Sequence, residues 1–390
     1  MARQQVKIDS IPVGPLGIIA LESSKKIGQK VNNYITEWRN DRVMDDSSEV
    51  SIEGYRKDSY LVESQCPRFG TGEAKGIIRS SVRGDDIYIL LDVTNYSITY
   101  TVSGHLNHMS PDDHFQDLKR IIAAMAGKAR RITVIMPFLY ESRQHKRSAR
   151  ESLDCAMALQ ELMNMGVESV ITFDAHDPRV QNAIPLKTFE TIRPTYQFIK
   201  ALLRNVPDLT LDADHLMLIS PDEGAMDRAV YFANVLGVDM GMFYKRRDYT
   251  VIENGKNPIV AHEFLGTNVD GKDCIVVDDM ISSGDSMLDV ARELKKRNAK
   301  RIFVCSTFGL FTNGLKRFDE AYKEGLIYRI ITTNLIYQTE ELLSRPYYIR
   351  ADMSKYIAIL IDTLNHDQSI SELLDPTDRI RKILKKYKKA

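Results

Sequence analysis

The chain of 390 residues contains only four cysteines, and their positions exclude several kinds of site. No two of them form a CxxC pair, which a structural zinc site or a dithiol redox centre would require. They are scattered through apolar stretches, at Cys66, Cys155, Cys274 and Cys305. We therefore expect buried free thiols in a reducing compartment and no zinc.

Excess charge and long hydrophobic runs are absent as well. Lys and Arg total 53, as do Asp and Glu, so the formal net charge is zero. This balance argues against a dedicated nucleic-acid or membrane-surface protein, and any anion site must be local. No stretch approaches the roughly 20 apolar residues of a membrane helix, and the apolar run near the N-terminus is too short for a secretory signal. We therefore predict a cytoplasmic protein with no nucleic-acid or membrane partner.

Short β-branched runs alternate with longer helical patterns along the chain. Strands are expected at residues 16–21, 87–93, 132–137, 169–173, 215–220, 240–244, 274–277, 301–306 and 328–333. Helical patterns cover residues 152–165, 223–236, 286–297 and 314–324. This alternation is typical of mainly parallel sheets flanked by helices. The number of strands exceeds what one such sheet usually holds, so we predict two α/β domains joined near residues 185–200.

Three segments interrupt this pattern. Residues 39–60 are polar and are expected to form a loop or insertion, and residues 95–115, rich in Ser, Thr, His and Asn, form a second insertion. The basic C-terminus places apolar residues at helical spacing, at Ile380, Ile383, Leu384 and Tyr387. This spacing predicts an amphipathic helix. We expect it to dock on its own protein or on a sister subunit rather than on a membrane or RNA.

The stretch CIVVDDMISSGDSM, residues 274–287, ends an expected strand in two acids and a loop of small residues. Ligands of open α/β sheets bind beyond the carboxyl ends of the strands. Backbone N–H groups in such a loop, at the start of a helix, form an anion site. Asp278 and Asp279 beside a phosphate cradle suit a phosphorylated sugar, whereas the alternative is an acidic turn that caps a helix.

Two further strand ends carry charged groups. Basic residues crowd the segment between Arg143 and Arg150, a density that suits a polyphosphate unless the segment is simply a solvated basic loop. The next strand ends in DAHD, residues 174–177, whose carboxylates and imidazole could hold Mg²⁺ against phosphate oxygens. A structural hydrogen bond between His176 and a neighbouring acid is the alternative.

In order along residues 15–335, these motifs resemble the ribose-phosphate diphosphokinase family, also called phosphoribosyl-diphosphate synthetase. RFGTGE at 68–73 resembles the loop that contacts adenine, and YESRQHKR at 140–147 resembles the stretch that holds the ATP phosphates. TFDAHD resembles the metal site. SPDEGAMDRA at 220–229 resembles the turn that faces the ribose, and YKRRDYT at 244–250 the start of the flexible catalytic loop.

The resemblance implies a role for each matching residue. Catalysis falls to Lys245, Arg247 and His176, and ATP binding to Phe69, Glu73, Arg143, Gln144 and Lys146. Ribose 5-phosphate falls to Asp222, Asp278, Asp279, Ser282, Ser283, Gly284 and Ser286. Asp174 and His176 would hold Mg²⁺.

The implied fold consists of two phosphoribosyltransferase-type domains, each a mainly parallel sheet flanked by helices. We expect an ATP and metal domain at residues 1–190, a ribose 5-phosphate domain at 191–345, and a helical extension with a basic tail at 346–390. The implied reaction moves the diphosphoryl group of ATP to the C1 hydroxyl of ribose 5-phosphate. Members of the family assemble as homo-oligomers, commonly hexamers built from dimers, in which subunits complete one another's adenine sites.

Two residues depart from the family pattern in the acidic loop. Ser282 stands where the family has an acid that contacts the sugar, and Asp285 stands where it has glycine. At an effective dielectric constant near 20, two unit charges about 4 Å apart repel by about 4 kcal/mol, so Asp285 should face away from a bound phosphate. The departures leave two alternatives to an active diphosphokinase, namely a catalytically weak regulatory homologue and a phosphoribosyltransferase.

Overall fold

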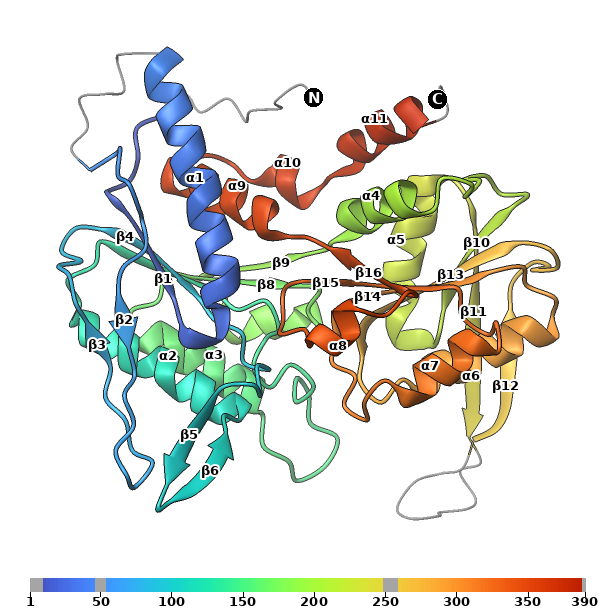
Figure 1. The fold of residues 1–390 in the computed structure, drawn as a ribbon, viewed down its shortest axis with the longest axis horizontal. Helices are drawn as coiled ribbons and strands as arrows, with labels where there is room; N and C mark the ends of the chain where they lie inside the picture. Colours follow the sequence, from blue (N-terminus) through green and yellow to red (C-terminus); the bar gives the residue numbers. More distant parts are fainter. Residues whose placement is uncertain (1–9, 46–53, 248–258, 388–390) are drawn as a thin grey trace. The chain divides into compact units, whose positions relative to one another are not determined.

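The computed structural model describes residues 10–45, 54–247 and 259–387 (Figure 1). The chain divides into two compact units. The first comprises Met1–Arg193, Asn334–Tyr337 and Asp352–Asp375, and the second comprises Pro194–Thr333, Gln338–Ala351 and Pro376–Ala390. The chain therefore enters the second unit three times, at Pro194, Gln338 and Pro376, and returns to the first unit twice in between.

The first unit is built on a five-stranded parallel sheet with the order β1-β4-β7-β8-β9. Its strands are β1 (Leu16–Ala20), β4 (Asp86–Leu90), β7 (Arg131–Ile135), β8 (Ser169–Phe173) and β9 (Thr188–Ile192). Strand residues are buried on both faces, as expected of a parallel sheet covered by helices. The carboxyl ends of all five strands thus meet at one edge of the sheet.

Helices cover both faces of this sheet. In Figure 1, α1 (Lys25–Asp45) and α9 (Ser354–Asn365) lie on one face, while α2 (Pro111–Met125) and α3 (Asp154–Asn164) lie on the other. A capping box at Ser110 starts α2, and the apolar face of this helix packs on the strands in one hydrophobic cluster. The short helix α10 (Ser371–Leu374) follows α9.

The second unit holds a seven-stranded sheet with the order β12-β11-β10-β13-β14-β15-β16. Its strands are β10 (Leu216–Ser220), β11 (Asp239–Arg247), β12 (Ile259–Leu265), β13 (Asp273–Ile281), β14 (Ile302–Gly309), β15 (Arg329–Thr333) and β16 (Tyr348–Ala351). All neighbours are parallel except β11 and β12, which form an antiparallel pair at one edge. The two α/β units agree with the fold class expected from the sequence.

Alternate residues of the strands in the second unit pack into two separate hydrophobic clusters. One cluster joins the sheet to α4 (Thr195–Asn205), α5 (Met226–Leu236) and α11 (Thr377–Tyr387). The other joins it to α6 (Asp285–Lys296), α7 (Lys316–Lys323) and α8 (Glu340–Leu343). Ile380 of α11 is fully buried in the first cluster, so the docking of the C-terminal helix on its own chain is confirmed. None of the described helices is long and apolar enough to cross a membrane.

The three segments that interrupted the sequence pattern differ from expectation. A loop or insertion was predicted at residues 39–60, but helix α1 continues to Asp45, so the prediction was wrong for residues 39–45. Residues 46–53 lie outside the described part of the chain. The insertion at 95–115 is a hairpin, β5 (Thr99–Val102) and β6 (His105–His108), followed by the start of α2. A second small hairpin pairs β2 (Ser64–Gln65) with β3 (Ile77–Ile78).

Residues 346–390 do not form one extension. Their first strand, β16, is the edge of the second sheet, α9 packs on α1 in the first unit, and α11 returns to the second. Local patterns gave no sign of this division, because it depends on contacts with residues hundreds of positions earlier.

Candidate active site

The acidic pair lies within β13, not after it. Pairing of β10 with β13 stops at Ile219 and Val276, whereas pairing of β13 with β14 continues to Ile281 and Gly309. The prediction that the strand ends before Asp278 was therefore wrong, because hydrogen bonds to β14 carry it four residues further. One side of this projecting segment lies beyond the end of β10, at the carboxyl edge of the sheet where ligands bind in such folds.

Burial and neighbouring charges set the ionisation of the pair. Asp279 is almost completely buried, and its backbone N–H donates to Oδ1 of Asp278 over 2.9 Å. Burial, followed by the charge of Asp279, raises the pKa of Asp278 well above its usual range. Nη1 of Arg228 lies 3.8 Å from Oδ1 of Asp278 and opposes that rise. The carboxyl pair is thus an acceptor-rich site in which the charged form of Asp278 is disfavoured and Arg228 opposes that effect only in part.

Asp222 joins this cluster from the turn that follows β10. Its Oδ1 accepts from the N–H groups of Gly224 at 3.0 Å and Ala225 at 3.3 Å, which caps the short 3₁₀ helix Glu223–Ala225. Its charge contributes to the raised pKa of Asp278. The structure therefore brings Asp222 and Asp278 together, as expected. The sequence interpretation missed Arg228, whose only signal was its place in the first turn of the helix after that turn.

The loop after β13 leads directly into α6. Gly284 adopts φ +85°, and a Cβ there would lie 2.1 Å from the ring of Phe318, so only glycine fits. Ser283 Oγ donates to Asp285 Oδ2 over 2.9 Å, and the carbonyl of Ser282 accepts from the N–H of Thr312 over 3.0 Å. These contacts hold the loop against the first turn of α6, whose N–H groups lack intrahelical acceptors.

Asp285, the carboxylate that departs from the family loop, is engaged by two side chains, Ser283 and Arg317. It forms a half-exposed ion pair with Arg317. The Ser283 hydroxyl and then Arg317 lower the pKa of Asp285, so it is ionised at neutral pH. Because Asp285 also accepts from the hydroxyl of Ser283, its carboxylate lies against the loop, and its orientation away from a bound anion stays a prediction.

In the first unit, the DAHD motif directly follows β8, and its first residue, Asp174, has a strained backbone. Asp174 has φ +42°, a left-handed conformation that costs about 1–3 kcal/mol outside glycine and is found mostly at functional sites. Its N–H donates to the carbonyl of Ile192 over 3.0 Å, and the residue is buried. His176 is exposed, and its ring centroid lies 5.4 Å from that of His145. The structure thus places Asp174, His176 and the basic loop at neighbouring strand ends.

Asp177 has a structural role in this motif. Its carboxylate accepts from Nε of Arg179 at 2.9 and 3.1 Å and lies 3.4 Å from Nε2 of His145. The hydrogen bonds from Arg179 lower its pKa to about 2. Nδ1 of His145 is buried without a hydrogen-bond partner among the described residues.

The side-chain amide of Gln144 stabilises the basic loop between Arg143 and Arg150. Nε2 of Gln144 donates to the carbonyl of Ser152 over 2.7 Å and to that of Lys146 over 3.3 Å. Arg143 and Lys146 are exposed. The loop therefore presents its cations outward, while Gln144 is engaged within the loop.

The RFGTGE loop is a tight turn that presents an aromatic ring. The N–H of Phe69 donates to the carbonyl of Glu73 over 2.7 Å, and the N–H of Gly72 donates to that of Phe69 over 2.9 Å. Thr71 Oγ1 donates to Glu73 Oε2 over 2.9 Å. Phe69 is 52% exposed, which leaves its ring available for stacking.

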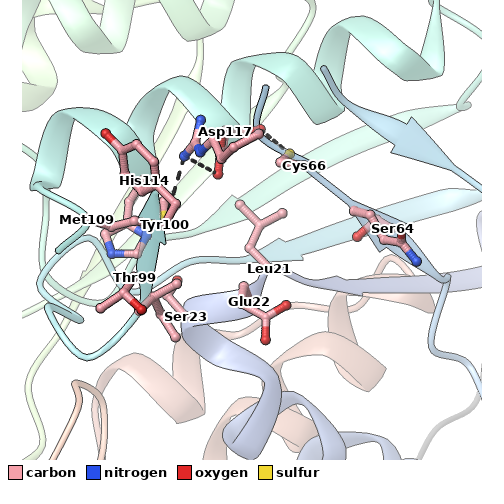
Figure 2. Close-up of a pocket in the computed structure, with 13 residues that line it drawn as sticks. Leu21, Glu22, Ser23, Ser64, Cys66, Thr99, Tyr100, Met109, His114 and Asp117 are labelled. Carbon is pink, nitrogen blue, oxygen red and sulfur yellow. Dashed lines mark hydrogen bonds and ion pairs between the residues drawn. The ribbon is translucent and has the colours of Figure 1, made fainter. Parts of the chain in front are cut away.

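A pocket of about 260 Å³ lies beside this loop in the first unit (Figure 2). It is lined by Leu21, Glu22, Ser23, Ser64, Gln65, Cys66, Arg68, Ile98, Thr99, Tyr100, Met109, His114 and Asp117. Burial lowers the pKa of His114, whose Nε2 lies 2.9 Å from the carbonyl oxygen of Asn95. The sequence interpretation missed this pocket, because its walls come from segments separated along the chain.

The two remaining expected catalytic residues end a strand. Lys245 and Arg247 lie within the last three residues of β11. Their side chains, and residues 248–250 at the end of the YKRRDYT stretch, lie outside the described part of the chain. Within residues 10–45, 54–247 and 259–387, no group of three His, Cys, Asp or Glu side chains forms a ready-made metal site.

Comparison with known proteins agrees with this arrangement. Residues 16–166 match the N-terminal domain of ribose phosphate pyrophosphokinase, and residues 186–339 match the phosphoribosyl transferase domain.

Relatives and a solved structure extend the match over most of the chain. The ribose-phosphate pyrophosphokinase of Vibrio parahaemolyticus is 28% identical over 319 residues, covering 81% of this chain and 92% of its own length. That of Mycoplasma genitalium is 28% identical over 295 residues, covering 75% and 81%. The phosphoribosylpyrophosphate synthetase structure from Mycobacterium smegmatis has the same fold, with a TM-score of 0.67 at 20% identity, covering 90% of this chain and 99% of its own. The two domains, their order and their strand-end motifs together place this chain in the ribose-phosphate pyrophosphokinase family.

Proposed function

We propose that this protein is a ribose-phosphate diphosphokinase, which transfers the β,γ-diphosphoryl group of ATP to the C1 hydroxyl of ribose 5-phosphate. The products are 5-phosphoribosyl 1-diphosphate and AMP. The observation that carries the proposal is the presence of two different strand-end sites in two similar units. One is an acidic sugar-phosphate loop, and the other combines a basic loop with an Asp-x-His motif. A simple phosphoribosyltransferase needs only the first.

The second unit binds ribose 5-phosphate in this proposal. Asp222, Asp278 and Asp279 accept hydrogen bonds from the ribose hydroxyls, and Arg228 favours the charged form of Asp278 against the effect of burial. The 5-phosphate is held by the small-residue loop, through Ser282, Ser283, Gly284 and Ser286. The start of α6 supports it, because helix N-termini favour anions. The pairing of Asp285 with Arg317 keeps the extra carboxylate from repelling the phosphate.

The first unit binds ATP in this proposal. The exposed ring of Phe69 stacks on the adenine, and Glu73 shapes the loop that presents it. Arg143 and Lys146 bind the phosphates as exposed cations, a role suited to flexible basic side chains. Gln144 contributes only after it releases Ser152 or Lys146, so it acts first as a brace.

We propose Mg²⁺ as the cofactor, held by Asp174 and His176. The fit is good for a metal that arrives on ATP phosphates, because Mg²⁺ usually takes only one or two protein carboxylates. Asp174 supplies a carboxylate on a strained backbone, and Asp177 is already engaged by Arg179. When bound, Mg²⁺ would neutralise charge on the phosphates. The chain's own contribution is to hold the nucleotide still against that strand end.

Lys245 and Arg247 are proposed to stabilise the charge that develops during transfer. Phosphoryl-type transfer relies on positioning and electrostatics more than on covalent chemistry. Removing one such donor typically costs roughly 3–4 kcal/mol, or about 10²–10³ in rate. Both residues end β11, so the sheet fixes their backbone.

The decisive experiment incubates the protein with ATP, Mg²⁺ and ribose 5-phosphate and follows AMP and phosphoribosyl diphosphate. We expect AMP formation that depends on the sugar and falls by about 100-fold or more in Lys245→Ala. The matched control is Lys296→Ala, an exposed lysine of α6, which should retain wild-type rates. Sugar-independent AMP would contradict the proposal. The absence of AMP under any phosphate and metal condition would also contradict it and would favour a regulatory homologue.

Ser282 offers a second test of the same site. Restoring the family's acid with Ser282→Asp should mainly lower the KM for ribose 5-phosphate, because an extra acceptor would face the sugar. An unchanged KM would mean that Ser282 does not face the sugar.

We also propose a homo-oligomer built from dimers in the cytoplasm. Two features of the chain fit this proposal: the exposed ring of Phe69, which suits a site shared between subunits, and the four free cysteines. Analytical ultracentrifugation tests the oligomer, since a monomer at micromolar concentration would contradict it.

A further inference from the structure

The β5–β6 hairpin is not used by the proposed reaction, although it lies beside the RFGTGE loop. Its turn residues Ser103 and Gly104 have φ +48° and +85°, which is the conformation of a tight hairpin turn. A two-stranded hairpin alone is marginally stable in water, so this one depends on contacts with its neighbours.

Three contacts join the hairpin to the RFGTGE loop, residues 68–73. The N–H of Ser103 donates to the carbonyl of Gly70 over 2.8 Å. Gly72 packs so closely on Val102 that a Cβ at residue 72 would lie 2.9 Å from it. The guanidinium of Arg68 lies 4.8 Å from the centre of the Tyr100 ring, a cation–π contact.

Tyr100 of the hairpin and Arg68 of the loop are also anchored to the rigid part of the first unit. Tyr100 donates its hydroxyl to Asp113 over 3.1 Å, and Arg68 donates to Asp117 over 2.9 Å. Both acids belong to α2, whose apolar face is packed in the core of the first unit. Helix α2 therefore supports both the hairpin and the loop.

A pocket lies beside the loop on this side. The pocket of about 260 Å³ lies where Arg68, Cys66 and Tyr100 meet, so packed side chains do not fill the space there. Figure 2 shows Tyr100, His114 and Asp117 grouped on one wall of this pocket, with Cys66 nearby. The hairpin contacts therefore add to the Arg68–Asp117 pair in holding the loop beside this pocket.

We infer that the β5–β6 hairpin is a positioning element that fixes the RFGTGE loop, so that Phe69 is held ready for the base of the nucleotide. Tyr100 and Val102 are the positioning residues. The inference rests on the proposed function in one respect, namely that Phe69 contacts the base of ATP. It adds that the affinity for the nucleotide depends on residues that do not touch it.

The kinetic test compares three hairpin variants. Tyr100→Ala should raise the KM for ATP by about fivefold to tenfold, the range expected from losing a cation–π contact and its packing. The KM for ribose 5-phosphate and kcat should change by less than about twofold, because the sugar site and the transfer residues lie elsewhere. Tyr100→Phe keeps the ring under Arg68 and should restore a KM near that of the wild type.

Leu106→Ser is the matched control. Leu106 lies in β6 of the same hairpin, is 67% exposed and has no contact with the loop among those described, so its KM values should be those of the wild type. If Tyr100→Ala leaves the KM for ATP unchanged, or raises both KM values equally, the positioning role is overturned.

A second measurement does not need activity. The chain has one tryptophan, Trp38, so Phe69→Trp in a Trp38→Phe background places a single reporter on the loop. We expect Tyr100→Ala to lower its fluorescence anisotropy, and Tyr100→Phe and Leu106→Ser to leave it unchanged. Equal anisotropy in all variants would overturn the inference even in an active enzyme. If the wild type forms no AMP but Tyr100→Ala still lowers the anisotropy of the reporter, the proposed function alone is overturned.

Discussion

At the scale of single residues, one cation faces several carboxylates beyond the end of β10. Arg228 lies 3.8 Å from Asp278, whose pKa is raised by burial, Asp279 and Asp222. A raised pKa means that the charged carboxylate, the better acceptor for sugar hydroxyls, is disfavoured in this environment. The ionisation of Asp278 therefore depends on Arg228.

We predict that Arg228→Gln makes binding of ribose 5-phosphate more dependent on pH. Without the cation, the pKa of Asp278 rises further, so the carboxyl is protonated over more of the acidic range and becomes charged only as pH rises. The KM for ribose 5-phosphate should increase, most strongly at low pH, and recover as pH rises. The ratio of variant to wild-type KM across pH 6 to 9 measures this effect and cancels the titration of the sugar phosphate itself.

Arg228→Lys is the control for this prediction, since it keeps the charge and should give a nearly flat ratio. A flat ratio in Arg228→Gln as well would show that Arg228 does not govern the charge of Asp278.

A second prediction at this scale concerns Gly284. Gly284→Ala places a methyl group against Phe318 and a non-glycine residue at φ +85°. The left-handed conformation alone costs about 1–2 kcal/mol, and the collision must move the loop. We expect a KM for ribose 5-phosphate raised by about tenfold, measured by steady-state kinetics. Gly314→Ala has a similar φ of +73° in open space, so it should lose stability without a comparable change in KM.

At the scale of elements, the basic C-terminal helix is held by its apolar face. Ile380 is fully buried, Ile383 and Leu384 pack on the same cluster, and the Tyr387 hydroxyl donates to the carbonyl of Pro207 over 2.7 Å. The basic side chains of α11 lie mostly on the other side of the helix. The helix is therefore part of the second unit's core and not a detached tail.

We predict that Ile380→Ala lowers the free energy of unfolding by about 2–5 kcal/mol, the usual cost of such a cavity. Arg381→Ala, at a side chain 67% exposed on the same helix, should change it by less than about 0.5 kcal/mol. Urea unfolding followed by circular dichroism measures both. Equal midpoints for the two variants would mean that α11 adds little to the stability of the unit.

At the scale of the whole molecule, the first unit is completed by a segment that follows the second. Helix α9 returns to pack on α1, and there Asp362 accepts from Nε of Arg39 over 2.9 Å and pairs with Arg42. Nη2 of Arg39 also donates to Asn365 over 2.7 Å, and Asn365 donates to Asp86 in β4 over 2.9 Å. Residues 352–375 are therefore structural parts of the first unit.

We predict that Asp362→Ala costs about 3–5 kcal/mol at pH 7, because it leaves Arg39 buried without its partner. Burial opposes ionisation, but Arg39 and Arg42 outweigh it and hold the pKa of Asp362 below its usual value. A depressed pKa stabilises the fold above the unfolded value, near about 3.9, and this contribution is lost as pH falls below it. The difference between variant and wild type should thus shrink below about pH 4 in urea titrations.

Asp367→Asn is the control, because Asp367 is 77% exposed and its positive φ of +53° suits asparagine. It should match the wild type at every pH. A gap between Asp362→Ala and wild type that does not change with pH would contradict the role of the Asp362 charge.

The sequence by itself determined the strand–helix alternation and the strand-end motifs. All nine expected strands are present, because hydrophobic period and β-branched runs act over a few residues. It also predicted the amphipathic face of α11.

Only the tertiary structure decided the extra length of β13, the place of Arg228, the pocket beside the RFGTGE loop, and the hairpin that contacts it. It also decided the return of α9, where Arg39 and Asp362 meet across 323 positions of sequence. The reason is physical: local patterns set which residues form an element, whereas strand pairing, buried ion pairs and cavity walls depend on which distant segments come together in the fold.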